Sequence, residues 1–133
     1  MNFTENFFRL AGTIAFAILT LSIVSCSEDN ELPKTVMPWD WEPEEPELVS
    51  GKAVYSKTCY LCHNEGEESA PMLTDRSEWE ERIAKGEALL IQNAIKGFFG
   101  DDGHMPPRGD NKSLTDEEVT AAVRFMIAAP KNH

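Results

Sequence analysis

The chain has 133 residues, of which 41% are hydrophobic and 26% are charged, and this is an ordinary globular composition. It excludes a disordered polar polymer and a membrane protein with several spanning segments. Acidic residues outnumber basic ones by 23 to 12, and the net charge of −11 disfavours binding to nucleic acids or anionic lipids through charge. The chain is also too short for a large enzyme with a deep substrate cleft.

The amino-terminal segment resembles a secretion signal. Residues 10–24 form an uncharged apolar run that is shorter than the roughly 20 residues needed to span a bilayer. The run ends in the sequence IVSC at residues 23–26, which resembles a bacterial lipobox, whose cysteine is lipidated and starts the mature protein. We therefore predict a signal peptide over residues 1–25 and a lipid anchor on Cys26. The alternative is a transmembrane anchor that contains a buried cysteine.

Residues 26–47 are predicted to be an acidic, proline-rich flexible tether, in which Lys34 is the only basic residue. Such a segment buries too little apolar surface to fold. At about 3.1 Å per residue, it could hold a domain up to about 70 Å from its anchor. Trp39 and Trp41 interrupt the polar pattern. They either dock on the domain or a partner, or lie loosely on a surface, and the second interpretation is favoured here.

Residues 48–133 are predicted to form one domain, which begins with a helix from about residue 49 to residue 57. This helix delivers the sequence Cys59-Tyr60-Leu61-Cys62-His63, a CxxCH motif typical of covalent attachment of a c-type haem. Cysteines about one helical turn apart bring their sulfurs to the two vinyl groups of one porphyrin. The adjacent histidine then lies under the iron as an axial ligand.

Two other uses of these cysteines are disfavoured. A zinc site needs further ligands from a second Cys or His cluster, but His104 and His133 are isolated in the sequence. A redox dithiol of the thioredoxin type would require a strand-rich α/β pattern, which is missing. With Cys26 lipidated and the other two cysteines joined to haem, none remains for a disulfide.

A second helical region is predicted to start at Ser77, which caps it together with Glu80, and to continue after a break at Gly86. A third helix has Thr115 as its cap and Glu118 as the reciprocal partner, with an apolar stripe from Val119 to Ile127. No run alternates apolar and polar residues over the length of a strand. The domain is therefore predicted to be all-α.

The sixth ligand of a haem iron is predicted to be Met105. It lies in the sequence GHMPPRG at residues 103–109, where two prolines stiffen the backbone and the glycines allow close approach to a porphyrin. Met72 follows the CxxCH motif too closely, and Met126 belongs to a helical apolar stripe, where core packing is the usual role. Met37 lies in the tether. His104 is the main competitor as a ligand.

Residues 48–129 resemble a class I cytochrome c, of the short group typified by bacterial cytochrome c-five. The segment 98–104 is a few residues longer than the usual approach to the methionine. Apart from the CxxCH motif, the resemblance rests on Gly51-Lys52, Tyr55, Ala70-Pro71, Leu73, Trp79, Arg82, Gly86, Ala94, Gly97, residues 105–109 and residues 114–119.

The resemblance implies a small class I cytochrome c fold of three to four helices around one haem c, attached through Cys59 and Cys62. It implies that the ligating His63 donates its other ring nitrogen to the Pro71 carbonyl. It also implies a close crossing of the first and last helices at Gly51, Tyr55 and Phe125, for which plain packing is the favoured interpretation. The porphyrin then serves as part of a small core.

Two further side chains are candidates for binding the haem propionates, because an indole N–H and a guanidinium both suit carboxylates. These are Trp79 and Arg82. Core packing is an equal alternative for Trp79, and a solvated helix charge is the favoured alternative for Arg82. Arg108 is a further candidate of the same kind, with a similar alternative.

These features predict a single-electron carrier rather than an enzyme, with no catalytic residue. With His63 and Met105 both on iron, no position is open for oxygen or peroxide, and Met/His ligation raises the potential. We expect transfer from a respiratory donor to a terminal oxidase or reductase. The alternatives are a subunit of a haem peroxidase or reductase, and a gas sensor that exchanges Met105 for its ligand.

The expected partners are redox proteins with a basic docking face, including membrane respiratory complexes, and the protein is expected to be a monomer that binds no nucleic acid. The expected location is the outer membrane of a Gram-negative-type bacterium, on its periplasmic side or at the cell surface. Residues 27–31 resemble the acidic export signal of some surface lipoproteins, and a solvated tether is the equal alternative.

Overall fold

A computed structural model describes residues 36–101 and 103–132 of the chain. The predicted signal peptide, Cys26 and residues 26–35 of the predicted tether lie outside the described residues. All described residues belong to one unit, Pro33–His133. Among them, no helix is both long enough and apolar enough to cross a membrane.

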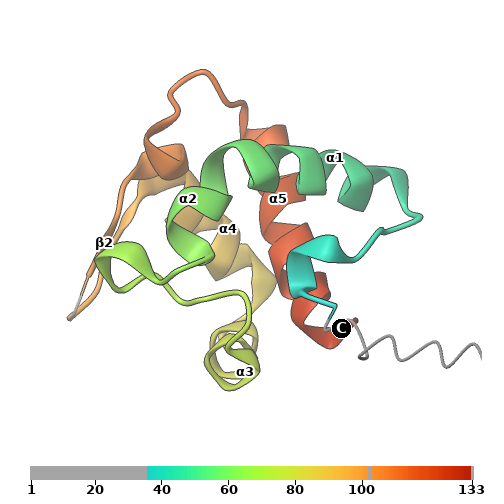
Figure 1. Cartoon of the computed structure of the whole chain (residues 1–133). Coiled ribbons are helices and arrows are strands. Elements are labelled where there is room, and N and C mark those ends of the chain that lie inside the picture. The colour runs from blue at the N-terminus through green and yellow to red at the C-terminus, as the bar shows by residue number, and fades with distance from the viewer. Residues whose placement is uncertain (1–35, 102, 133) are drawn as a thin grey trace, which may run out of the picture. The chain divides into compact units, whose positions relative to one another are not determined.

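Two helices that lie far apart in the sequence, α1 (Pro46–Val54) and α5 (Asp116–Ala128), cross at the centre of the fold (Figure 1). The predicted start of α5 is confirmed. The Thr115 hydroxyl accepts a hydrogen bond from the Glu118 N–H at 3.2 Å, and the Thr115 N–H donates to the Glu118 carboxylate at 2.8 Å. This capping box satisfies amide groups that the first turn of a helix leaves without partners.

The crossing of α1 and α5 depends on Gly51, which is buried in α1. A Cβ atom built on Gly51 would lie 2.1 Å from the Ala121 backbone oxygen, so only glycine allows the two backbones to approach this closely. Beside the crossing, the rings of Tyr55 and Phe125 are fully buried with centroids 5.3 Å apart. The close approach implied by the resemblance is confirmed, and plain packing was the wrong interpretation.

Helical backbone continues beyond α1 into the CxxCH motif. A π-helical turn (Tyr55–Cys59) leads directly into the short helix α2 (Tyr60–His63). The predicted helix ended at Lys57, so the helical run is longer than the sequence indicated. Single π-helical turns are rare and occur frequently at functional sites.

The second predicted helical region is divided into α3 (Arg76–Ile83) and α4 (Glu87–Lys96), with the predicted break at Gly86, whose φ of +101° favours glycine. The predicted cap at Ser77 was wrong. Asp75 is the cap, and its carboxylate accepts from the Glu78 N–H at 3.1 Å. The Ser77 hydroxyl instead donates to the same carboxylate at 2.7 Å, because the ionised group is the stronger acceptor.

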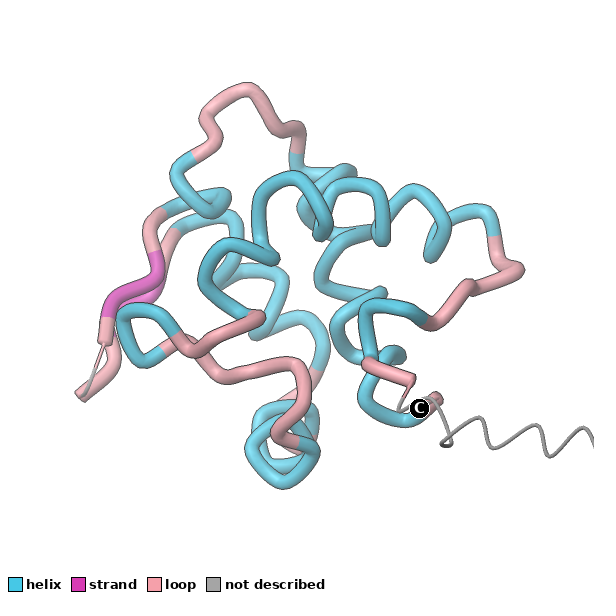
Figure 2. The backbone as a smooth tube through the Cα atoms, in the orientation of Figure 1, coloured by secondary structure: helices cyan, strands magenta, loops and turns pink. Residues whose placement is uncertain are grey.

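A short hairpin precedes and includes Met105, although no strand was predicted. Strand β1 (Phe98–Phe99) pairs with the antiparallel strand β2 (His104–Met105), with Phe98 opposite Met105 and Phe99 opposite His104. The Gly100 N–H donates to the Gly103 carbonyl at 2.8 Å and closes the turn. Two-residue strands leave no room for an alternating pattern, and the described chain remains mostly helical (Figure 2).

Residues 37–43, which we call the strap, pack on the domain. Trp39 lies edge-on to Tyr60 with centroids 5.7 Å apart, and Trp41 stacks on Phe125 at 5.9 Å with an interplanar angle of 10°. Glu42 adds an ion pair with the Lys52 ammonium at 2.7 Å. The interpretation that both tryptophans lie loosely on a surface was therefore wrong, because α2 and α5 present the Tyr60 and Phe125 rings that the indoles cover.

Replacing Trp41 with alanine should lower the free energy of unfolding by about 2 kcal/mol, because a stacked, half-buried indole loses its contact with Phe125. Urea unfolding of the haem-loaded protein, followed by circular dichroism, measures the change. Phe99→Ala is the matched control, since this ring is 81% exposed and its loss should change the value by less than about 0.5 kcal/mol. Equal effects of the two substitutions would refute a stabilising strap.

Candidate haem site

The two cysteines of the CxxCH motif lie on one continuous helical segment. Cys59 ends the π-helical turn and lines a small apolar cavity of about 20 Å³ together with Met105. Burial raises the pKa of the Cys59 thiol to about 11. Burial, followed by the charges of Glu67 and Glu68, also raises the pKa of Cys62. Both side chains are therefore neutral thiols near neutral pH.

Within residues 36–101 and 103–132, no three His, Cys, Asp or Glu side chains are grouped so that they could hold a metal ion. The motif therefore lacks the second ligand cluster that a structural zinc site requires. Covalent attachment of a porphyrin needs only the two thiols and the neighbouring imidazole.

His63 is 7% exposed, and its ring orientation is set by one hydrogen bond. Its Nδ1 lies 2.9 Å from the Pro71 carbonyl oxygen, which can only accept. Nδ1 therefore carries the proton, and Nε2 keeps the lone pair that a metal ion needs. Burial lowers the pKa of His63 despite the opposing effect of the Pro71 carbonyl, and the Arg82 charge lowers it further. The contact with Pro71 is the one that the resemblance implies.

Met105 is half-buried in β2, on a loop that the structure holds in place at both ends. On one side, Gly97 adopts a φ of +83°, and a Cβ there would lie 2.9 Å from the Met105 carbonyl oxygen. On the other side, the Arg108 guanidinium donates to the Leu114 carbonyl at 3.0 Å and pairs with Asp116 at 2.5 Å. Arg108 thus ties the loop to the start of α5 through two of its guanidinium nitrogens.

The competing ligands are placed differently. Met72 is 39% exposed, and Met37 lies in the strap. His104 is exposed and stacks on Phe99 with centroids 4.3 Å apart. Met126 is 4% exposed and packs in the core cluster with Tyr55 and Phe125, as predicted, although it also lines the cavity that Cys59 and Met105 share.

The two predicted propionate donors each make a hydrogen bond within the protein. The Trp79 indole N–H donates to the Met72 carbonyl at 2.9 Å, and its ring is 5% exposed beside His63. Core packing is therefore the role that the structure supports for Trp79. The Arg82 guanidinium donates to the Glu78 carbonyl at 3.0 Å, one turn back on α3. This side chain lies along its own helix and acts on His63 through its charge.

The residues present fit a covalently attached haem by the chemistry of their donors. Two neutral thiols, a neutral imidazole with Nε2 available and a thioether are combined with an apolar cavity lined by Val54, Ala94, Leu114 and Val123 among others. The Tyr55 hydroxyl, beside Cys59, and the Asn64 side-chain oxygen are buried without a hydrogen-bond partner among the described residues. Buried polar atoms of this kind commonly mark sites where a bound group or water belongs.

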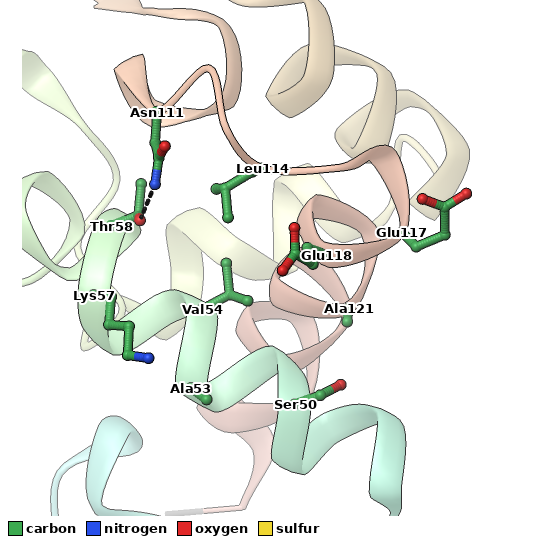
Figure 3. A pocket seen from close by; sticks show the side chains of 10 residues that line it. All are labelled: Ser50, Ala53, Val54, Lys57, Thr58, Asn111, Leu114, Glu117, Glu118 and Ala121. Atoms are coloured by element: carbon green, nitrogen blue, oxygen red, sulfur yellow. Dashed lines mark hydrogen bonds between the residues drawn. The ribbon is translucent and has the colours of Figure 1, made fainter.

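A larger cavity of about 530 Å³ lies between α1, α5 and the loop 111–114 (Figure 3). The Asn111 side-chain amide donates to the Thr58 hydroxyl at 3.4 Å at its edge. None of the predicted haem-site residues lines this cavity. The size of a cavity therefore does not identify the haem site in this protein. The thiols, the imidazole and the thioether identify it by their chemistry.

Sequence reasoning missed the contact that joins the loop after the CxxCH motif to the hairpin. A Cβ on Gly103 would lie 2.2 Å from the Glu68 backbone oxygen, so the two loops touch through their backbones. Glu68 and Ser69 adopt φ values of +52° and +59°, which are unusual for residues other than glycine. The glycine before the His104-Met105 pair was the only sequence signal for this contact.

Comparison with known proteins agrees with this site. Residues 46–126 match the family model described as cytochrome c oxidase, cbb3-type, subunit III. Cytochrome c-555 of Chlorobaculum thiosulfatiphilum is 40% identical over 64% of this chain and 99% of its own length. Cytochrome c5 of Azotobacter vinelandii is 36% identical over 58% of this chain and 90% of its own length.

A structural neighbour supports the same conclusion. It is a chain in the crystal structure of an electron transfer complex of nitrite reductase with cytochrome c, with a TM-score of 0.55 and 31% identity, covering 65% of this chain and 96% of that one. The fold is therefore the small class I cytochrome c fold. The chain belongs to the cytochrome c family, and it is an electron-transfer protein with covalently bound haem c, not an enzyme.

Proposed function

We propose that the protein is a membrane-tethered carrier of single electrons whose haem c is attached through Cys59 and Cys62 and ligated by His63 and Met105. The observation that carries this proposal is the state of His63, a buried neutral imidazole whose Nδ1 bonds to the Pro71 carbonyl. The bound haem supplies an iron that changes its charge by one electron. His63 and Met105 would hold this iron, and His63 is buried within the protein.

The ligands of the iron distinguish an electron carrier from the two alternatives, an enzyme subunit and a gas sensor. A peroxidase or reductase subunit needs an open position on the iron, and a gas sensor needs a ligand that leaves readily. The anchoring of the Met105 loop through Gly97 and Arg108 favours a methionine that stays in place.

Optical spectra of the oxidised and reduced protein, combined with a redox titration and a carbon monoxide titration, test the proposal. We expect the spectrum of a six-coordinate haem c, a single one-electron transition and little binding of carbon monoxide. Tight carbon monoxide binding would favour a gas sensor. Turnover of peroxide or nitrite by the purified protein would favour the enzymatic alternative.

We also propose that residues 1–25 are removed as a signal peptide, that Cys26 carries a lipid, and that the following residues tether the cytochrome domain. The apolar run before Cys26 and the acidic residues after it support this organisation. The described strap shows that part of the predicted tether, residues 37–43, packs on the domain. The proposed location is the outer membrane of a Gram-negative-type bacterium, facing the periplasm or the cell surface.

Replacing Cys26 with serine should move the protein from the membrane fraction to the soluble fraction, or leave the precursor uncleaved, because the lipidated thiol is removed. Fractionation followed by mass spectrometry of the amino terminus measures both results. Ser27→Ala is the matched control and should remain processed and membrane-bound. A Cys26 variant that is processed and fractionates with membranes like the parent would exclude the lipoprotein.

The proposed partners are a respiratory donor and a terminal oxidase or reductase, each with a basic docking face. The net charge of −11 supports a basic face. The structural neighbour found in a complex with nitrite reductase supports a larger redox enzyme as one partner. Complementary charge raises the rate of encounter more than the affinity, so these contacts are expected to be short-lived.

A further inference from the structure

The hairpin that carries Met105 displays aromatic side chains to solvent. Phe99 is 81% exposed and Phe98 is 49% exposed. One face of Phe99 stacks on the His104 ring, with centroids 4.3 Å apart and an interplanar angle of 25°. We call Phe98, Phe99 and His104 the aromatic edge. Strand pairing and the Gly100–Gly103 hydrogen bond join its two strands.

The aromatic edge lies next to the place where haem is attached. Gly103, at the base of β2, packs on the backbone of Glu68 and on the Ser69 side chain. Glu67 and Glu68 lie on the turn directly after α2, where the Gly66 N–H donates to the Cys62 carbonyl at 2.9 Å. In Figure 1, the turn that follows α2 lies beside β2. A protein that covers the aromatic edge would therefore also approach the Cys62 side of the haem.

Acidic side chains lie in the hairpin turn and on the neighbouring turn that Gly103 contacts, whereas Lys96 is exposed at the end of α4 just before β1. Glu67 and Glu68 are exposed on the turn that Gly103 contacts, and Asp101 is exposed in the turn of the hairpin itself. An apolar centre with a charged rim is the arrangement found in specific protein contacts, where the centre supplies binding energy and the rim supplies orientation. The acidic rim selects a partner with lysine or arginine around an apolar centre.

We propose that the aromatic edge and its acidic rim form the surface on which a basic redox protein docks. This inference rests on the proposed function, since it names the surface and the class of partner of the same haem site. In the docked pair, one electron leaves the reduced protein and reduces the oxidised partner, and no bond forms or breaks. Phe99 fills the apolar centre, and Glu67 and Glu68 orient the partner by charge.

The test measures second-order rate constants for electron exchange by stopped flow, in the thermodynamically favoured direction, over a range of salt concentrations. Mitochondrial cytochrome c serves as the basic protein probe, and tris(phenanthroline)cobalt serves as a small probe that needs no docking surface. The variants are Phe99→Ser, the double variant Glu67→Gln/Glu68→Gln, and the control Leu89→Ser. Leu89 is 42% exposed on α4, outside the hairpin and the acidic turn.

We expect Phe99→Ser to lower the rate with the protein probe about tenfold, because the apolar contact of one phenyl ring is lost in the docked pair. Its rate with the cobalt complex and its reduction potential should match those of the parent. The double variant should lose part of the salt dependence with the protein probe, because screening acts on charges that have been removed. Leu89→Ser should resemble the parent with both probes.

Two results would overturn this proposal. One is a Phe99→Ser variant that reacts with the protein probe as fast as the parent, and the other is a double variant whose salt dependence with that probe equals that of the parent. A parent protein that exchanges electrons with neither probe would instead contradict the proposed electron carrier. A parent that reacts with both probes upholds the carrier, whatever the variants show.

Discussion

Replacing Met105 with alanine should open the sixth coordination position of the haem. The reduced variant should bind carbon monoxide, and its reduction potential should fall by a substantial part of the roughly 0.8 V over which axial ligands set haem potentials. The physical reason is the loss of a thioether ligand that favours the reduced iron. Carbon monoxide titration and a redox titration of the purified variant measure the two effects.

Met72→Ala is the matched control, because it removes the same side chain from an exposed position. It should leave the spectrum and the potential unchanged, and the Met72 carbonyl remains available to the Trp79 indole. An unchanged spectrum in the Met105 variant would show that another side chain ligates the iron. His104 is then the next candidate, and a His104→Ala variant would identify it.

The haem-attachment motif and the capping of α5 could be predicted because both depend on residues close together in the sequence. The CxxCH pattern requires one helical turn, and the Thr115–Glu118 capping box requires three residues. Closeness in sequence also explains why Ser77 was wrongly predicted to cap α3. Asp75 and Ser77 are two residues apart and both suit a cap, and the choice depends on which side chain accepts from the Glu78 N–H.

Features that depend on distant contacts were missed or misjudged. The strap was expected to be loose because its acids and prolines indicate disorder, yet Trp41 stacks on Phe125, which lies at the other end of the domain sequence. Local composition does not reveal an aromatic face that exists only after α1 and α5 cross. The Trp79 hydrogen bond to Met72 is similar, because a carbonyl in a loop carries no recognisable sequence signal.

In the haem site too, the features set by neighbouring residues could be predicted, and those set by distant contacts could not. The donors Cys59, Cys62 and His63 follow from the motif, whereas the contact of His63 with Pro71 was available only through the resemblance to a family. The docking surface proposed above depends on the position of Gly103 against Glu68, which places two loops side by side. Exposed phenylalanines in a sequence do not by themselves indicate a surface, since single exposed apolar residues are common.

The close crossing of α1 and α5 leads to the second large effect, on stability. Replacing Gly51 with alanine should lower the free energy of unfolding of the haem-loaded protein by about 3 kcal/mol or more, or prevent folding altogether. The added Cβ would lie 2.1 Å from the Ala121 carbonyl oxygen and 2.5 Å from its carbonyl carbon. Both are backbone atoms inside α5, so the helices must separate along their contact.

Two effects of opposite sign act in this substitution, and their sizes decide the outcome. Alanine stabilises the interior of a helix by about 1 kcal/mol relative to glycine, which favours the variant. Separation of α1 from α5 loosens the packing of Tyr55 and Phe125, which costs more. Guanidinium unfolding followed by circular dichroism measures the sum. Ser50→Ala, at an exposed position of the same helix, should change the free energy by less than about 0.5 kcal/mol. If the Gly51→Ala variant is as stable as the parent, α1 and α5 do not approach each other as closely as the structure shows.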